Sequence, residues 1–227
     1  DLNITVDSND TSIITVNPSW SGLQSSTQYA NPLDFNLTTI NHAYGSVQIT
    51  VSVNDGTVTT SNTYNIDVTS VNDVPVFSGI FTGTATEDVG GSFGTIYIDD
   101  NDTGQDNFEA NTSIGTYGTF VLDANGSWTY DINSSLSSVQ ELQGGEIVID
   151  SFTVTSADSN VSQSFDVNVS GVNDVPTFVT DLSSFSVNED NGTISYELNA
   201  TDIDSGDDLN ITVDSNNTDI LRVSPSW

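Results

Sequence analysis

The sequence is constrained most by a pentapeptide, Val71-Asn72-Asp73-Val74-Pro75, which returns unchanged as Val172–Pro176 after 101 residues (172 − 71). Proline fixes its own φ angle and favours an extended conformation in the residue before it. Each copy directly follows an alternating apolar run, as expected at the exit of a last β-strand. A polar, stiff segment that recurs at one domain length is typical of a joint between two domains.

A second repeat fixes the order of the domains. Residues 208–227 match residues 1–20 at 15 of 20 positions, which gives a period of 207 residues (208 − 1). We therefore predict three segments: 1–73 is the C-terminal part of one sandwich, 74–174 is a complete sandwich, and 175–227 is the N-terminal part of the next copy of the first. Two domains together make one period.

The hydrophobic pattern predicts strands almost everywhere. Alternation of apolar and polar residues over Val47–Val53, Ile147–Thr155 and Phe165–Val169 indicates half-buried strands. Asn54-Asp55-Gly56 and Asn125-Gly126 are hairpin signals. Short strands are also expected over Ile4–Val6, Ile13–Val16, Tyr64–Val68, Phe93–Ile98 and Ile194–Leu198, with an extended stretch over Tyr29–Ile40 and one helical turn near Val139. The expected fold class is all-β, with antiparallel Ig-like β-sandwich domains joined end to end in a rod.

The charge of the chain excludes several classes of function. The sequence has 32 Asp and Glu residues against one basic residue, Arg222, so its net charge is −31. Binding to nucleic acid or to an anionic membrane surface needs many Lys and Arg residues, and neither is expected here. No apolar run reaches membrane-spanning length, so we expect no membrane insertion in this segment. Self-repulsion on this scale favours bound divalent cations.

Cysteine is absent, so neither disulfides nor thiolate metal sites are available. An extracellular chain without disulfides needs another way to tie its domains, and calcium is the cation that suits its oxygen-rich composition.

The motifs resemble those of known repeat families. The Asp202-Ile203-Asp204-Ser205-Gly206 loop, Glu189 before it and the Val-Asn-Asp-Val-Pro exits resemble a bacterial or archaeal cadherin-like repeat. Glu87-Asp88, Gly118–Phe120, Gly126–Tyr130, Leu142 with Gly145-Glu146, and Phe152 resemble the repeat called VCBS. Together the resemblances cover nearly the whole chain. They imply a segment of a very large surface adhesin, with calcium at the joints.

The acidic residues near each joint are the candidate calcium ligands. We predict that an exit, the next domain's first strand and its acidic loop converge at each joint. For the first joint these are Asn72, Asp73, Glu87, Asp88, Asp100 and Asp102; for the second they are Asn173, Asp174, Glu189, Asp190, Asp202 and Asp204. Alternate residues of an extended loop point to one side, which lets Asp100 act with Asp102. The cadherin linker has further ligands where this chain has Ser70 or Gly171 and Val74 or Val175, so we expect one or two ions per joint. The alternative is a solvated acidic loop without an ion.

Asn-x-Ser/Thr sequons are abundant and suggest N-glycosylation on a cell surface. They begin at Asn3, Asn9, Asn36, Asn101, Asn111, Asn125, Asn133, Asn160, Asn168, Asn191, Asn199, Asn210 and Asn216. The alternative is that strands rich in Ser, Thr and Asn produce such triplets without selection.

No catalytic arrangement is recognisable. His42 is the single histidine, and beside Tyr44 it is read as structural. Without Cys or Lys, the chain offers no nucleophile with an adjacent base. We therefore expect no enzyme activity, no catalytic residues and no organic cofactor.

The sequence is read as a structural repeat of a long extracellular adhesin or surface filament, stiffened by Ca²⁺ at its joints. Its expected partners are neighbouring repeats of the same chain or head-to-tail copies, and cell-surface glycans or proteins. One alternative is a glycan- or protein-binding sandwich module, which would gather aromatic residues on one exposed face. The other is a filament subunit that polymerises by strand complementation, because segments 1–73 and 175–227 each contain what the other lacks.

Overall fold

The computed structural model describes residues 1–20, 22–24, 33–181 and 183–223. These residues form fifteen strands and one short helix, α1 (Ser137–Gln140), so the all-β prediction is confirmed. They divide into two compact units. Unit 1 contains residues 1–75 and 99–105, and unit 2 contains residues 76–98 and 106–227. The predicted stretch from Tyr29 to Ile40 lies partly outside the described residues.

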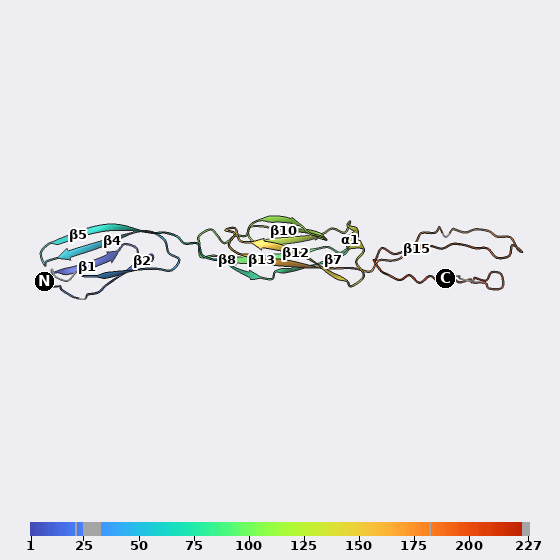
Figure 1. Cartoon of the computed structure of the whole chain (residues 1–227), viewed down its shortest axis with the longest axis horizontal. Coiled ribbons are helices and arrows are strands. Elements are labelled where there is room, and N and C mark those ends of the chain that lie inside the picture. Colours follow the sequence, from blue (N-terminus) through green and yellow to red (C-terminus); the bar gives the residue numbers. More distant parts are fainter. Residues whose placement is uncertain (21, 25–32, 182, 224–227) are drawn as a thin grey trace. The chain divides into compact units, whose positions relative to one another are not determined.

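Unit 1 contains two small sheets (Figure 1). The first has the order β1 (Asn3–Ser8), β4 (Gly45–Asn54), β5 (Thr59–Val68), and the second pairs β2 (Ile14–Pro18) with β3 (Phe35–Thr39); all of these pairs are antiparallel. The predicted Asn54-Asp55-Gly56 turn joins β4 to β5. The Asp55 carboxylate accepts the N–H groups of Thr57 and Val58, which closes the turn.

The core of unit 1 is small. Only Val6, Ile14, Val47 and Ile49 are fully buried hydrophobic residues among the described part of this unit. Trp20 packs against them, and its indole N–H donates to the carbonyl oxygen of Ile4 at 3.2 Å. The core therefore lies between β1 and β4 on one side and β2 on the other, while β5 contributes little buried surface.

Unit 2 contains a sandwich of two sheets. Its larger sheet has the order β6 (Val76–Gly79), β8 (Ser92–Asp99), β11 (Ser127–Ile132), β10 (Gly118–Leu122), β9 (Asn111–Ile114). Its smaller sheet has the order β12 (Ile147–Thr155), β13 (Ser162–Ser170), β7 (Thr82–Thr86). The predicted hairpin on Asn125-Gly126 connects β10 and β11, with Leu122 opposite Trp128.

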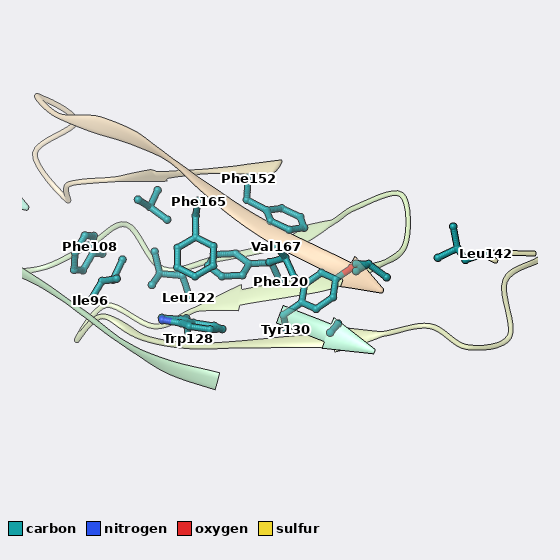
Figure 2. Packing of buried hydrophobic residues seen from close by; sticks show 13 residues of the cluster. Ile96, Phe108, Phe120, Leu122, Trp128, Tyr130, Leu142, Phe152, Phe165 and Val167 are labelled. Carbon is teal, nitrogen blue, oxygen red and sulfur yellow. The ribbon is translucent and has the colours of Figure 1, made fainter. Parts of the chain in front are cut away.

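Aromatic side chains from both sheets meet in the core of unit 2 (Figure 2). Phe165 on β13 lies 4.7 Å from the rings of both Phe120 and Trp128, measured between ring centroids. Phe152 on β12 stacks on Phe120 at 5.0 Å. Because large rings from alternate strand positions interdigitate, this sandwich has a single well-packed core.

β7 departs from the predicted antiparallel pattern, because it pairs with β13 in parallel. The chain crosses from the larger sheet at β6 to the smaller sheet at β7, so β7 enters that sheet running in the direction of β13. As a result, the C-terminal ends of β7 and β13 lie side by side at the same end of the sheet. The residues after β7, Glu87 and Asp88, are thereby brought to the exit of β13.

Residues 176–223 contain little regular structure. β14 (Thr177–Phe178) pairs with β15 (Ala200–Thr201), and Phe185 stacks on Tyr196 with ring centroids 5.2 Å apart. The strand predicted over Ile194–Leu198 is wrong, since these residues form no strand in the structure. Within the described residues this segment meets no long neighbouring strand that could supply the backbone partners a sheet requires. The domain boundaries after residues 73 and 174 remain a prediction.

Candidate metal sites

The first acidic cluster is defined here as Asp73, Asp100 and Asp102, all in unit 1. The backbone N–H of Asp73 donates to Asp102 Oδ2 at 2.6 Å, and the backbone N–H of Asp102 donates to Asp100 Oδ1 at 2.8 Å. Asp102 is buried. These bonds tie the acidic loop to the exit that follows β5, as predicted for the exit and the loop of the first joint.

The second acidic cluster is defined as Glu87, Asp88, Asp174, Asp202 and Asp204, all in unit 2. Its loop repeats the geometry of the first. The backbone N–H of Asp174 donates to Asp204 Oδ2 at 2.8 Å, and that of Asp204 donates to Asp202 Oδ1 at 3.1 Å. The same bonds therefore recur at both exits, which makes them a consequence of the repeated sequence pattern.

Glu87 is fully buried and completes the second cluster. Its carboxylate accepts the backbone N–H of Val172 at 2.9 Å and the side-chain amide of Gln140 at 3.1 Å. The same Gln140 amide donates to Asp88 Oδ1 at 3.0 Å. One side chain from α1 thus holds both carboxylates at the exit of β13.

The predicted grouping of Glu87 and Asp88 with the first joint is wrong. Both lie at the second exit, because the parallel pairing of β7 with β13 carries them there. The sequence predicts Glu189 and Asp190 as ligands at the second joint. They are exposed in a turn, and the charges that act on Asp174 come from the second cluster itself.

Two carboxylate oxygens of the second cluster are buried without a hydrogen-bond partner among the described residues: Asp174 Oδ2 and Asp204 Oδ1. Burial raises the pKa of Glu87 above the usual carboxylate range, and the charges of Asp174, Asp88 and Asp204 raise it further. Burial and the charge of Asp204 also raise the pKa of Asp174. The protein groups around this cluster therefore leave its negative charge uncompensated, and a cation would compensate it.

Asn72 and Asn173 occupy equivalent places in the two exits. Asn72 Nδ2 donates to the carbonyl oxygen of Asp73 at 2.8 Å, and the Asn173 amide makes the same contact with Asp174. Each amide braces the backbone of the acidic residue that follows it. Their role as metal ligands remains a prediction.

Sequence reasoning missed Asp207. Asp202, Asp204 and Asp207 each offer a carboxylate oxygen, and these oxygens lie within 4.8 Å of one another. The Gln143 side-chain amide donates to Asp207 Oδ1 at 3.2 Å. The signal was present in the sequence as the spacing Asp-x-Asp-x-x-Asp. The first loop has Gln105 at the matching position, so its acidic triplet is incomplete.

His42 contacts the first acidic cluster. Its Nδ1 atom lies 2.6 Å from Asp73 Oδ2, and its backbone has a positive φ of 61° in the turn before β4. This contact ties the turn before β4 to the exit after β5. The spacing of 31 residues between the two gave no sequence signal of this contact.

An open pocket between β9 and β12 is lined by Asp150, among other residues. The Asp150 carboxylate accepts the backbone N–H groups of Thr116 and Tyr117 at 2.8 and 3.0 Å, and the hydroxyl of Tyr130 at 2.7 Å. Three donors occupy its oxygens, so this carboxylate holds the turn after β9 against β12.

Comparison with known proteins finds a family model that matches the middle of the chain. Residues 72–171 match the family model described as bacterial cadherin-like domain. This confirms the cadherin-like resemblance, and it places that resemblance on the segment whose motifs also resemble VCBS. The VCBS resemblance itself remains a prediction. A search of curated proteins gave no match.

Solved structures of cadherin extracellular domains are similar to the chain. A protocadherin structure, PcdhgB3 EC1-4, has 15% identity and a TM-score of 0.43, and the match covers 89% of this chain and 50% of that one. Protocadherin Gamma B2 extracellular domains 1-5 have 18% identity and a TM-score of 0.41, and the match covers 90% of this chain and 40% of that one. Mouse Protocadherin-24 EC1-3 has 22% identity and a TM-score of 0.39, and the match covers 88% of this chain and 66% of that one. The chain spans about half the length of the first of these structures. Among the described residues, no helix is long and apolar enough to span a membrane.

Proposed function

We propose that the chain is a structural repeat segment of a long extracellular adhesin or surface filament, and that calcium binds at the two exits to stiffen it. The observation that carries the proposal is a pair of buried carboxylate oxygens, on Asp174 and Asp204, that have no hydrogen-bond partner within the described part of the chain and lie inside a cluster of like charges. Calcium prefers six to eight hard oxygen ligands with flexible geometry, and Asp and Glu carboxylates are among them.

The ligand set of the second site comes from three elements. We assign Glu87 and Asp88 after β7, Asp174 in the exit after β13, and Asp202 with Asp204 in the acidic loop. Asp207 extends this set on its exposed side. At the first exit, Asp73, Asp100 and Asp102 play the corresponding roles. A calcium ion held by an exit and by the loop that follows it would fix the conformation of both.

The family and the surface chemistry support an extracellular, non-enzymatic role. Residues 72–171 match a domain family of adhesion type. All thirteen sequon asparagines are exposed, which makes them accessible for N-glycosylation. We therefore infer that the chain presents a long polar surface outside the cell, with neighbouring repeats as its first partners.

Calcium binding by the full chain tests this proposal. In isothermal titration calorimetry we expect saturable uptake in the range of extracellular calcium sites, about 10⁻⁴–10⁻³ M or tighter. The substitution Asp202→Asn removes a charge from the second cluster and should weaken one class of site about tenfold or more. Asp219→Asn, an exposed acid outside both clusters, is the matched control and should change nothing. The proposal fails if calcium uptake is absent, or if Asp202→Asn and Asp219→Asn behave alike.

A further inference from the structure

The pocket between β9 and β12 lies where the two sheets of unit 2 meet at one side of the sandwich. β9 is the last strand of the larger sheet, and β12 is the last strand of the smaller one. At one end of the pocket, the backbone N–H of Glu109 donates to the carbonyl oxygen of Thr155 at 2.8 Å. At the other end, the backbone N–H of Thr116 donates to the Asp150 carboxylate. Between these two contacts, no backbone hydrogen bond joins β9 to β12 in the described structure, and a groove of about 650 Å³ opens there, called the edge groove below.

Two polar side chains of β9 face into the edge groove. In the antiparallel pairing with β10, Asn111 lies opposite Leu122. Ser113 lies opposite Phe120 in the same way. Residues directly opposite each other point to the same side of a sheet, and Leu122 and Phe120 are buried in the core between the sheets. Asn111 and Ser113 therefore point toward the smaller sheet, and Asn111 Nδ2 donates to Ser113 Oγ at 3.0 Å.

The same two residues are the first and third positions of a sequon, which spans residues 111–113. A sugar attached to Asn111 Nδ2 would therefore begin inside the edge groove. The sequon at residues 168–170 on β13 is different, because Asn168 lies between the buried residues Val167 and Val169 and points away from the core. A glycan attached to Asn168 would extend directly into solvent.

We propose that an N-linked glycan on Asn111 occupies the edge groove, with its first sugars held between β9 and β12. This inference rests on the N-glycosylation included in the proposed function. Ser113, Ser151 and Thr153 line the groove with hydroxyl groups that can donate to and accept from sugar hydroxyls. Ile149 adds an apolar surface for the C–H groups of a sugar ring.

The charge of the chain favours neutral sugars in this position. With 32 acidic residues against one basic residue, the surface repels anionic sugars, and the lining of the edge groove contains no basic residue. The Asp150 carboxylate at the end of the groove already accepts three hydrogen bonds, so a cationic group is not needed to satisfy it. A neutral glycan therefore fits the groove best.

A glycan held in this way would cover the edges of β9 and β12. The edge of a sheet can pair with a strand of another chain, which leads to aggregation. A bulky, polar glycan blocks that approach and keeps the surface soluble. The glycan on Asn111 would thus protect both sheets of unit 2 at their exposed side.

Release of the glycans by peptide N-glycosidase tests the proposal. The full chain is secreted from a host that attaches N-linked glycans, and mass spectrometry of glycopeptides follows each sequon during digestion of the folded protein. The glycan on Asn111 should be released at least tenfold more slowly than the glycan on Asn168, because the enzyme must reach the first sugar. In the unfolded chain the two rates should be equal, since both sequons have the form Asn-x-Ser.

The substitution Ser113→Ala provides a second measurement, because it removes the sequon and keeps Asn111. In protein from the glycosylating host, it should lower the melting temperature and increase aggregation on heating. In protein made without glycosylation, the same substitution should have a much smaller effect. Ser170→Ala removes the sequon of Asn168 and is the matched control, which should behave alike in both preparations.

Equal rates of release from Asn111 and Asn168 in the folded chain would overturn the proposal. An unmodified Asn111 in a chain that carries glycans at other sequons would also overturn it, and would leave the proposed function intact. A chain without glycan at any sequon would contradict both this inference and the N-glycosylation in the proposed function.

Discussion

The chain is expected to unfold at a much higher temperature in millimolar calcium than in chelator. A ligand that binds only the folded state stabilises it by RT ln(1 + [L]/Kd), which is roughly 3–4 kcal/mol at 100 to 1,000 times Kd. For a domain of this size, that corresponds to a shift in Tm of roughly 10–20 °C. Relief of the repulsion among the carboxylates of the second acidic cluster is one part of this binding free energy.

Differential scanning calorimetry in calcium chloride and in chelator measures this shift. A chain with a net charge of −31 also responds to simple screening by salt. Sodium chloride at equal ionic strength is therefore the required control, and magnesium chloride tests selectivity. Coincident melting curves in calcium chloride and sodium chloride would contradict specific binding.

Asp204→Asn is expected to change stability in opposite directions with and without calcium. Asp204 Oδ2 accepts the N–H of Asp174, and an asparagine oxygen can replace it in this role. Its other oxygen is buried without a partner among the described residues, beside other carboxylates. Removing this charge relieves its repulsion with the neighbouring carboxylates and should raise the unfolding free energy in chelator by about 1 kcal/mol, the interaction of two unit charges about 4 Å apart in water.

In calcium, the same substitution removes a ligand. A tenfold loss of affinity lowers the stabilisation by about 1.4 kcal/mol. Urea unfolding of the native chain and of Asp204→Asn, each in calcium and in chelator, provides the four free energies that this comparison needs. Asp219→Asn is the control, and its effect on the unfolding free energy should not differ in sign between calcium and chelator. An Asp204→Asn protein that is destabilised equally in both conditions would make Asp204 a structural residue of the loop.

Local signals in the sequence predicted the hairpins well. Asn54-Asp55-Gly56 and Asn125-Gly126 each close a two-stranded hairpin, because the side-chain oxygens and the positive φ of glycine determine such turns within a few residues. The alternating patterns of β4, β12 and β13 were equally informative, since each strand buries one face.

Local pattern alone does not decide whether a segment forms a strand. The hexapeptide Asn-Ile-Thr-Val-Asp-Ser occurs at residues 3–8 and again at 210–215. The first copy is β1 and pairs with β4 over its whole length, whereas the second forms no strand in the described structure. Identical residues thus adopt different structures, because a strand depends on the neighbour that pairs with it.

Some contacts of the candidate metal sites were predicted from the sequence, and others were not. The exit and the acidic loop were predicted to converge at each joint, and hydrogen bonds join Asp73 to Asp102 and Asp174 to Asp204. The position of Glu87 depends on the parallel pairing of β7 with β13, across more than 80 residues of sequence, and spacing alone placed it at the wrong exit. Gln140 was missed for the same reason.

The central claim is that the second acidic cluster holds calcium, and a crystal structure grown in calcium tests it most directly. We expect an anomalous difference peak between Asp174, Asp204 and Glu87, with six to eight oxygens at about 2.3–2.6 Å. Asp174 Oδ2 and Asp204 Oδ1, which have no partner among the described residues, should be among those ligands. Electron density for water alone at this position, in crystals held at millimolar calcium, would contradict the account.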